Sequence, residues 1–213
     1  IGGKNGIDVG LYKNMVGLIR QPKFLLFDFS FLRTLPKTEW QNGFAEIIKH
    51  ACIKDAAMFT LLQQQTLSAF QKNSKLLSSL VERNVLIKTK VVVSDEFEQG
   101  DRKLLNFGHT LGHAIENMYE LSHGQAISIG MTYAAVISQQ LKGYTGTKEL
   151  VSLLSKYGLP TFAKFDTKKA FKVLLKDKKK DNVSINYILL TKTGKGVIQP
   201  LLLVQLQDIL KQF

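Results

Sequence analysis

The stretch from Asp95 to Met131 constrains this chain more than any other, because it carries three of the four histidines within a segment of helical character. His109 and His113 are four residues apart, a spacing that places both rings on one face of a helix. The glycines beside them are poor helix formers, tolerated where a backbone must approach a neighbour closely. The sequence therefore allows either one continuous helix here or a break near Gly108.

The rest of the chain predicts a mainly α fold with several helices and one short β-hairpin. Apolar residues recur with a period near 3.6, and glycine or proline ends several of the runs. The hairpin is expected where apolar residues alternate around Gly194 and Gly196. The predicted helices span residues 38–64, 74–93, 124–141, 147–157, 165–175 and 204–213.

The N-terminal segment differs from this helical pattern. Residues 1–17 are rich in glycine and polar residues without a period, so they are expected to form a loop. The apolar run Lys23–Asp28 has the length of one buried strand. Because a single strand is not stable alone, we expect it to join a sheet supplied by sequence that precedes this chain.

Composition limits the classes of function. The 213 residues are 45% hydrophobic and 22% charged, which is typical of a globular protein, and no apolar run has the length of a membrane span. One cysteine, Cys52, excludes an internal disulfide and fits a cytoplasmic location. The net charge of +12 suggests an anionic partner. Nucleic acid is not expected, since the lysines are scattered and lack a basic stripe interleaved with aromatics. A small, multiply anionic substrate would explain the excess of positive charge at least as well as nucleic acid. Ordinary solvated lysines account for most of that excess.

The clustered histidines predict a metal centre. A catalytic zinc site takes three protein ligands from histidine and carboxylate and keeps one position open. His109, His123 and Glu46 would supply this set, because Glu46 interrupts an apolar helical face where an unpaired charge would be costly. His113 and His50 remain alternative ligands, and a pairing of Glu46 with a nearby lysine remains the alternative to ligation.

Several motifs in order resemble the 3-dehydroquinate synthase family. They are GGKNGIDVGLYKNMVG, LRTLP, GFAEIIKH, LNFGHTLGHAIE and HGQAISIGM, and they extend along most of the chain. The resemblance is to the family's helical C-terminal domain with its connecting segment. It implies that residues 1–35 contribute an interdomain loop and strand to a cofactor cleft, and that residues 36–213 form the helical metal- and substrate-binding domain. A Rossmann-like NAD domain would then be missing from this sequence.

The resemblance also implies a role for individual residues. It selects His109 over His113 as a ligand of zinc or cobalt, and it makes His113, Lys49 and Glu98 catalytic. The implied contacts with a sugar acid phosphate substrate come from Lys4, Asn14, Lys49, Lys88, Arg102, Asn106, His113 and Lys178. The implied NAD contacts come from Lys4, Lys13, Phe31, Leu32, Arg33, Thr34 and Leu35.

The implied reaction converts 3-deoxy-D-arabino-heptulosonate 7-phosphate to 3-dehydroquinate and phosphate, a step of the shikimate pathway of aromatic amino acid biosynthesis. NAD oxidises a hydroxyl transiently, phosphate leaves, the ketone is reduced again and the ring closes by an aldol step. Homodimers are common in the family. We expect the chain alone to bind metal but to turn over no substrate.

Three features depart from the family pattern, one of which is the lack of an expected glycine after Lys180. The other two lie near the histidines. Gln125 stands where many members have glutamate, and the segment between His113 and His123 is short, which could shift His123. The alternatives are another NAD- and zinc-dependent sugar phosphate cyclase, such as one making an inosose or a valiolone, and more distantly a metal-dependent dehydrogenase of the glycerol type. A basic helical module that binds nucleic acid is the alternative from outside enzymes.

Overall fold

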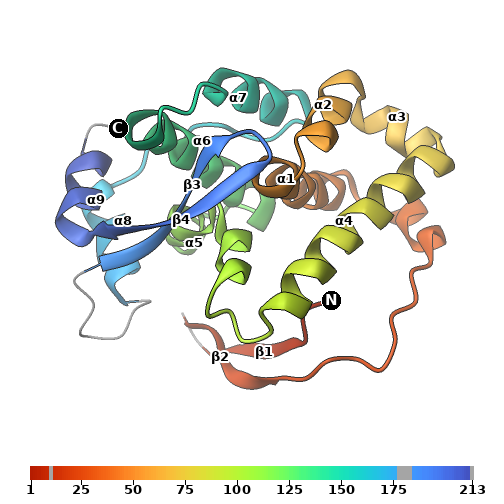
Figure 1. Ribbon diagram of the computed structural model, residues 1–213, viewed down its shortest axis with the longest axis horizontal. Helices are drawn as coiled ribbons and strands as arrows, with labels where there is room; N and C mark the ends of the chain where they lie inside the picture. The colour runs from red at the N-terminus through yellow and green to blue at the C-terminus, as the bar shows by residue number, and fades with distance from the viewer. Residues whose placement is uncertain (10–11, 177–183, 212–213) are drawn as a thin grey trace. The chain divides into compact units, whose positions relative to one another are not determined.

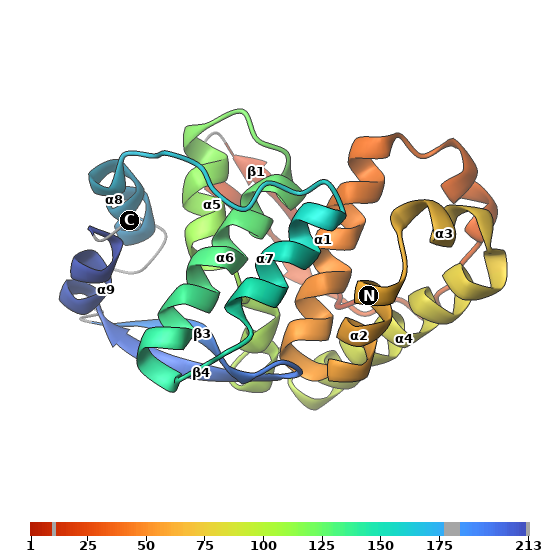
Figure 2. The same ribbon diagram turned by 90° about the horizontal axis from the view of Figure 1, so that it is seen from above.

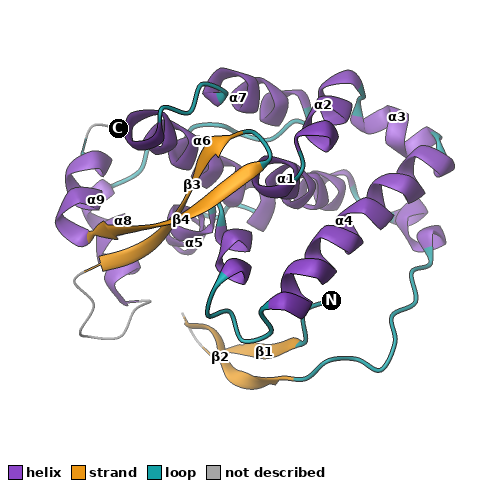
Figure 3. Ribbon diagram, in the orientation of Figure 1, coloured by secondary structure: helices purple, strands orange, loops and turns teal. Residues whose placement is uncertain are grey.

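The computed structural model describes residues 1–9, 12–176 and 184–211, and these are mainly helical, as the sequence predicts (Figure 1, Figure 3). The strands pair into two antiparallel hairpins, β1 with β2 and β3 with β4. No helix in these ranges is long and apolar enough to cross a bilayer. In chain order the elements are β1 (Lys4–Val9), β2 (Tyr12–Ile19), the 3-10 helix η1 (Phe29–Thr34), α1 (Lys37–Lys54), α2 (Ala56–Gln64), α3 (Leu67–Lys72), α4 (Ser74–Ser94), the 3-10 helix η2 (Asp101–Asn106), α5 (His109–Met118), α6 (His123–Lys142), α7 (Thr147–Lys156), α8 (Thr167–Lys176), β3 (Ser184–Lys192), β4 (Lys195–Leu202) and α9 (Leu203–Leu210).

The described residues fall into two compact units. The first contains Ile1–Leu35 and Ser68–Lys103, and the second contains Pro36–Leu67 and Leu104–Phe213. The predicted boundary at residue 35 coincides with the start of the second unit, but residues 68–103 group with the N-terminal segment. The division into a cofactor-cleft segment and a metal- and substrate-binding domain stays a prediction.

Helix α6 is the centre of the second unit. It packs against α1, α5, α7 and β3, and most of its side chains are buried, as its small and apolar sequence predicts. Figure 2 shows α6 between α5 and α1, with the β3–β4 hairpin across the ends of these helices. Strands β3 and β4 pair along their length, from Ser184 opposite Leu202 to Lys192 opposite Lys195. The predicted hairpin is therefore confirmed.

Glycines allow α5 and α6 to approach each other closely. Gly108 has a φ of +78°, a left-handed conformation that ends the preceding turn and starts α5, so of the two predicted arrangements the chain adopts the break. A Cβ atom on Gly130 of α6 would lie 1.9 Å from the carbonyl oxygen of Gly108. This contact fixes the start of α5 against the side of α6.

The N-terminal residues form more regular structure than predicted. The expected loop is a β-hairpin, in which Lys4 pairs with Ile19 and Gly6 with Gly17, with an irregularity between Ile7 and Val9. The prediction of a loop was wrong because backbone pairing forms this hairpin, although the apolar side chains described in it are exposed. Ile7, for example, is 64% exposed.

The strand predicted at Lys23–Asp28 is not formed. The segment has neither helical nor strand structure, and Phe24 and Leu26 are 79% and 86% exposed. Its backbone pairs with no strand among the described residues, which is the physical reason that the apolar run stays irregular here.

Candidate metal centre

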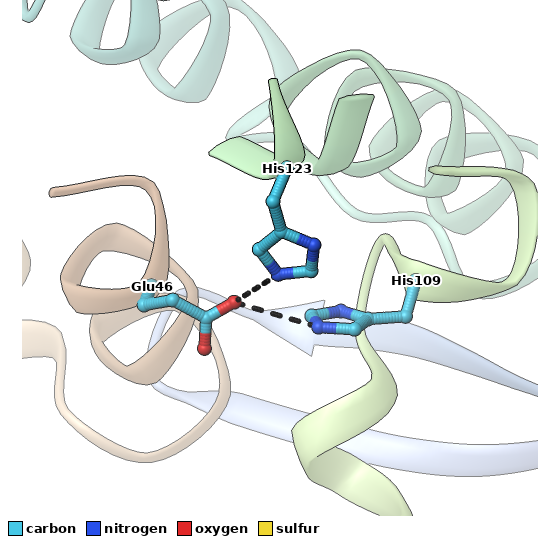
Figure 4. A group of neighbouring side chains, drawn as sticks. All are labelled: Glu46, His109 and His123. Atoms are coloured by element: carbon cyan, nitrogen blue, oxygen red, sulfur yellow. Dashed lines mark hydrogen bonds and ion pairs between the residues drawn. The ribbon is translucent and has the colours of Figure 1, made fainter. Parts of the chain in front are cut away.

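Three side chains from separate helices of the second unit converge on one point (Figure 4). Glu46 lies in the middle of α1, whereas His109 and His123 are the first residues of α5 and α6. The Oε1 atom of Glu46 lies 3.4 Å from the Nε2 atom of His109 and 3.4 Å from the Nε2 atom of His123. The three ligand atoms are within 4.8 Å of one another, so the predicted set is brought together.

The ring of His109 has a defined tautomer. Its Nδ1 lies 3.1 Å from the carbonyl oxygen of Phe107. A carbonyl only accepts, so Nδ1 carries the hydrogen, and the Nε2 atom of the neutral ring presents a lone pair. That lone pair faces a carboxylate oxygen. Two acceptors facing each other are stabilised by a cation between them, either a proton or a metal ion, and histidine with carboxylate is a common pair of metal ligands.

The distances around Glu46 also suit a metal ion. Its Oε1 atom lies 3.4 Å from each of the two imidazole nitrogens. Nitrogen and oxygen ligands about 2.0–2.2 Å from a tetrahedral zinc ion are roughly 3.3–3.5 Å apart. Glu46, His109 and His123 therefore form a three-ligand set that suits a divalent ion such as zinc or cobalt.

Neighbouring groups shift the pKa values of all three candidate ligands. Burial opposes ionisation of Glu46, but the Lys49 ammonium and the two neighbouring imidazole rings hold the pKa of its carboxyl well below the usual range. Burial and the neighbouring Lys49 lower the pKa of His109, which keeps its ring neutral. The hydrogen bond with Glu46 raises the pKa of His123, so protons and a metal ion would compete for this ring.

Lys49 is the cation beside this centre. Its Nζ lies 2.6 Å from Oε2 of Glu46, and its side chain is only 4% exposed. Glu46 therefore uses one carboxylate oxygen for Lys49 and the other for the two imidazoles. The sequence left open whether Glu46 is a metal ligand or the partner of a lysine, and the geometry accommodates both.

His113 and Asn106 lie in the same unit. The ring centroid of His113 is 5.2 Å from that of His109 and 6.1 Å from that of His123, so three imidazoles cluster. His113, Glu116 and His123 form a second group whose ligand atoms lie within 4.8 Å of one another. Asn106 ends η2, one turn before α5, and is half-buried.

A polar link between α1 and α6, which the sequence analysis missed, holds Glu46 and His123 together. The Asn42 side-chain oxygen accepts hydrogen bonds from the Ser122 hydroxyl at 2.7 Å and from the Gly124 N–H at 3.0 Å. Ser122 also forms a capping box with Gln125, which explains how glutamine serves at that position. The S-x-x-Q spacing before an apolar run was a readable signal, whereas nothing in the sequence marked Asn42.

Replacing Ser122 with alanine is expected to lower the free energy of unfolding by about 1 kcal/mol, because α6 loses its cap. The link to Asn42 would be lost as well. Denaturant titration of the variant measures the loss. Ser155→Ala is the matched control, because Ser155 is exposed in α7. Equal stability of the two variants would contradict the role given to the cap.

Other predicted site residues lie in the first unit. Lys4 forms an ion pair with Glu98, whose φ of +59° is unusual for a residue other than glycine. Arg102 is 4% exposed and donates hydrogen bonds to the carbonyl oxygens of Gly2, at 2.7 Å, and Glu96. Arg102 ties the start of the chain to the loop after α4.

The remaining predicted residues are placed only by element. Lys88 is half-buried in α4, and Lys13 and Asn14 belong to β2. Phe31 in η1 is 76% exposed, and Leu35 follows η1. Lys178 lies outside the described residues.

Comparison with known proteins agrees with this geometry. The family model described as 3-dehydroquinate synthase C-terminal matches residues 43–180, and the one described as 3-dehydroquinate synthase N-terminal matches residues 1–42. Among curated proteins, 3-dehydroquinate synthase of Dehalococcoides mccartyi is 38% identical over 204 residues, which are 93% of this chain and 56% of that protein. The one from Pyrobaculum aerophilum is 38% identical over 208 residues, 94% of this chain and 60% of that protein.

Solved structures share the fold. A 2-deoxy-scyllo-inosose synthase complexed with carbaglucose-6-phosphate, NAD+ and Co2+ matches with a TM-score of 0.79 at 25% identity, over 97% of this chain and 61% of that one. The 2-epi-5-epi-valiolone synthase of Streptomyces hygroscopicus, with NAD+ and Zn2+ bound, matches with a TM-score of 0.87 at 24% identity, over 100% and 61%. This chain spans a little more than half the length of the curated relatives. The matched family models and relatives establish that the chain belongs to the 3-dehydroquinate synthase family.

Proposed function

We propose that the chain is the metal- and substrate-binding part of a 3-dehydroquinate synthase. The reaction would convert 3-deoxy-D-arabino-heptulosonate 7-phosphate to 3-dehydroquinate and phosphate, with NAD held mainly by an N-terminal domain like that of the longer relatives. The observation that carries the proposal is the position of one Glu46 oxygen 3.4 Å from two imidazole nitrogens. The curated relatives at 38% identity support the choice of substrate.

The residues around the centre suit an anionic, polyhydroxylated substrate. A zinc or cobalt ion, when bound, would supply a Lewis acid that polarises a substrate hydroxyl. Helices α5 and α6 both begin at the ligand histidines, so their positive N-terminal ends lie at the site. Together with the buried ammonium of Lys49, they would offset the substrate's carboxylate and phosphate charges. His113 would hold or move a proton beside the substrate.

The motifs shared with the family also assign substrate and cofactor contacts to residues of the first unit. We assign Glu98 to an acidic group near the substrate, and Lys4, Asn14, Lys88 and Arg102 to its anionic groups and hydroxyls. Support comes from their motifs and, for Arg102, from a guanidinium held firmly by backbone carbonyls. The proposed NAD contacts are Lys4, Lys13 and residues 31–35. We also assign Lys178 to the substrate phosphate. The protein is proposed to form a homodimer and to act in the cytoplasm.

The test is a phosphate-release assay on the chain extended by the N-terminal half that its relatives carry. With NAD and zinc, we expect release from the heptulosonate phosphate, and none after the metal is stripped by a chelator. The 213-residue chain alone is expected to bind zinc and release no phosphate. Release by the chain alone would contradict the need for the NAD domain.

A second candidate is a related cyclase acting on a sugar phosphate without a carboxylate. The fold that this chain shares with an inosose synthase and a valiolone synthase supports this second candidate. The same assay with a hexose 6-phosphate separates the two, because that substrate lacks the carboxylate. Faster release from the hexose phosphate than from the heptulosonate phosphate would select the second candidate.

A further inference from the structure

The two ring nitrogens of His123 face two different carboxylates. Nε2 lies 3.4 Å from Oε1 of Glu46, and Nδ1 lies 3.4 Å from Oε2 of Glu116. A neutral imidazole has one hydrogen, so only one of these nitrogens can present a lone pair to a metal. The carboxylate that accepts the hydrogen decides which nitrogen that is.

We infer that Glu116 is a positioning residue of the metal centre, which accepts the Nδ1 hydrogen of His123 and so directs Nε2 toward Glu46 and His109. This inference rests on the metal centre proposed above. In metal sites, a carboxylate or carbonyl behind a histidine ligand commonly fixes its tautomer and ring orientation. The Phe107 carbonyl does this for His109, and Glu116 does it for His123.

The location of Glu116 explains why His123 needs such a partner. The side chain of His123 is 41% exposed, whereas that of His109 is 12% exposed, so packing alone constrains His123 less. Glu116 is 14% exposed and lies seven residues after His109, two turns along the same face of α5. One helix thus supplies a ligand at its first residue and the support for a second ligand near its end.

Another arrangement would make Glu116 a ligand itself. His113, Glu116 and His123 form a group with ligand-like spacing, so a second ion could bind on the Nδ1 side of His123. An ion there would require Nδ1 to lose its hydrogen. The two arrangements differ in the number of ions bound by each chain.

The experiment measures zinc affinity of the chain by competition with a chromophoric chelator. Glu116→Ala is expected to weaken zinc binding about 10- to 100-fold. Glu116→Gln is expected to recover most of the affinity, because its amide oxygen can still accept the Nδ1 hydrogen. Glu120→Ala is the matched control, since Glu120 is exposed just beyond α5, and it should leave the affinity unchanged.

Nitrogen-15 NMR of the imidazoles in the metal-free chain gives a second readout that a purely structural role would not move. His123 is expected to carry its hydrogen on Nδ1 in the unaltered chain and to lose this preference in Glu116→Ala. An unaltered affinity and tautomer in Glu116→Ala would overturn the inference while leaving the proposed function standing. Two zinc ions per chain, falling to one in Glu116→Ala, would also overturn it. A chain that binds no zinc at all would overturn the proposed metal centre instead.

Discussion

Replacing His109 with alanine is expected to weaken zinc binding on the order of 10²- to 10³-fold. Structural zinc sites bind with roughly 10–16 kcal/mol shared among four ligands, so one ligand accounts for about 2.5–4 kcal/mol, and each 1.4 kcal/mol is tenfold. His109 is the proposed ligand whose Nδ1 lies against the Phe107 carbonyl, which leaves its Nε2 atom to face Glu46. Chelator competition on the purified chain measures the change.

His113→Ala is the matched variant, because His113 belongs to the same helix and the same cluster of imidazoles. It should leave zinc affinity nearly unchanged. In the chain extended by an NAD domain, the same variant should lower phosphate release by roughly 10²- to 10⁴-fold, the usual contribution of a general acid or base. Thermal unfolding of both metal-free variants controls for loss of folding.

The opposite result would indicate that the ion binds at a different set of ligands. If His113→Ala lost zinc while His109→Ala retained it, the ion would lie among His113, Glu116 and His123, whose spacing is also that of a ligand set. Glu46 would then be only the partner of Lys49, which is the alternative that the sequence left open.

The helices and the convergence of the candidate metal ligands could be predicted because each leaves a local signal. Buried faces impose a period of 3.6 on residues such as those of α4 and α6, and the predicted limits of these helices differ from the observed ones by only a residue or so. Glu46 was recognisable because a carboxylate interrupts a buried apolar face. Gly108 signalled a possible break, and its left-handed conformation starts α5.

What the sequence could not predict depends on contacts between distant residues. The apolar side chains described in the β1–β2 hairpin are exposed, for example Val16 at 58%, so the sequence there shows no alternation imposed by a core. Asn42 and Glu116 act through partners 80 and 7 residues away, which only the packing of α1, α5 and α6 brings close. The hydrogen bond from buried Arg102 to the carbonyl oxygen of Gly2 joins residues 100 positions apart, and the sequence did not predict it.

The close approach of α5 and α6 makes a second large effect predictable. Gly130→Ala would place a methyl group 1.9 Å from the carbonyl oxygen of Gly108, and a backbone atom cannot rotate away as a side chain can. The helices must then separate. We expect a loss of about 3 kcal/mol or more in the free energy of unfolding, the upper end for overpacked cores.

Separation of the helices would also weaken the metal centre, because His109 follows Gly108 directly and His123 begins the helix that carries Gly130. Zinc affinity of Gly130→Ala should therefore fall together with stability, although no ligand is changed. Gly43→Ala is the matched control: a Cβ there meets no atom within 4 Å, and removing a helical glycine from α1 should raise stability by about 0.5–1 kcal/mol. Denaturant titration and chelator competition on both variants measure these effects. If Gly130→Ala were as stable as the unaltered chain and bound zinc as tightly, the glycine contact would not be what sets the distance between the two histidines.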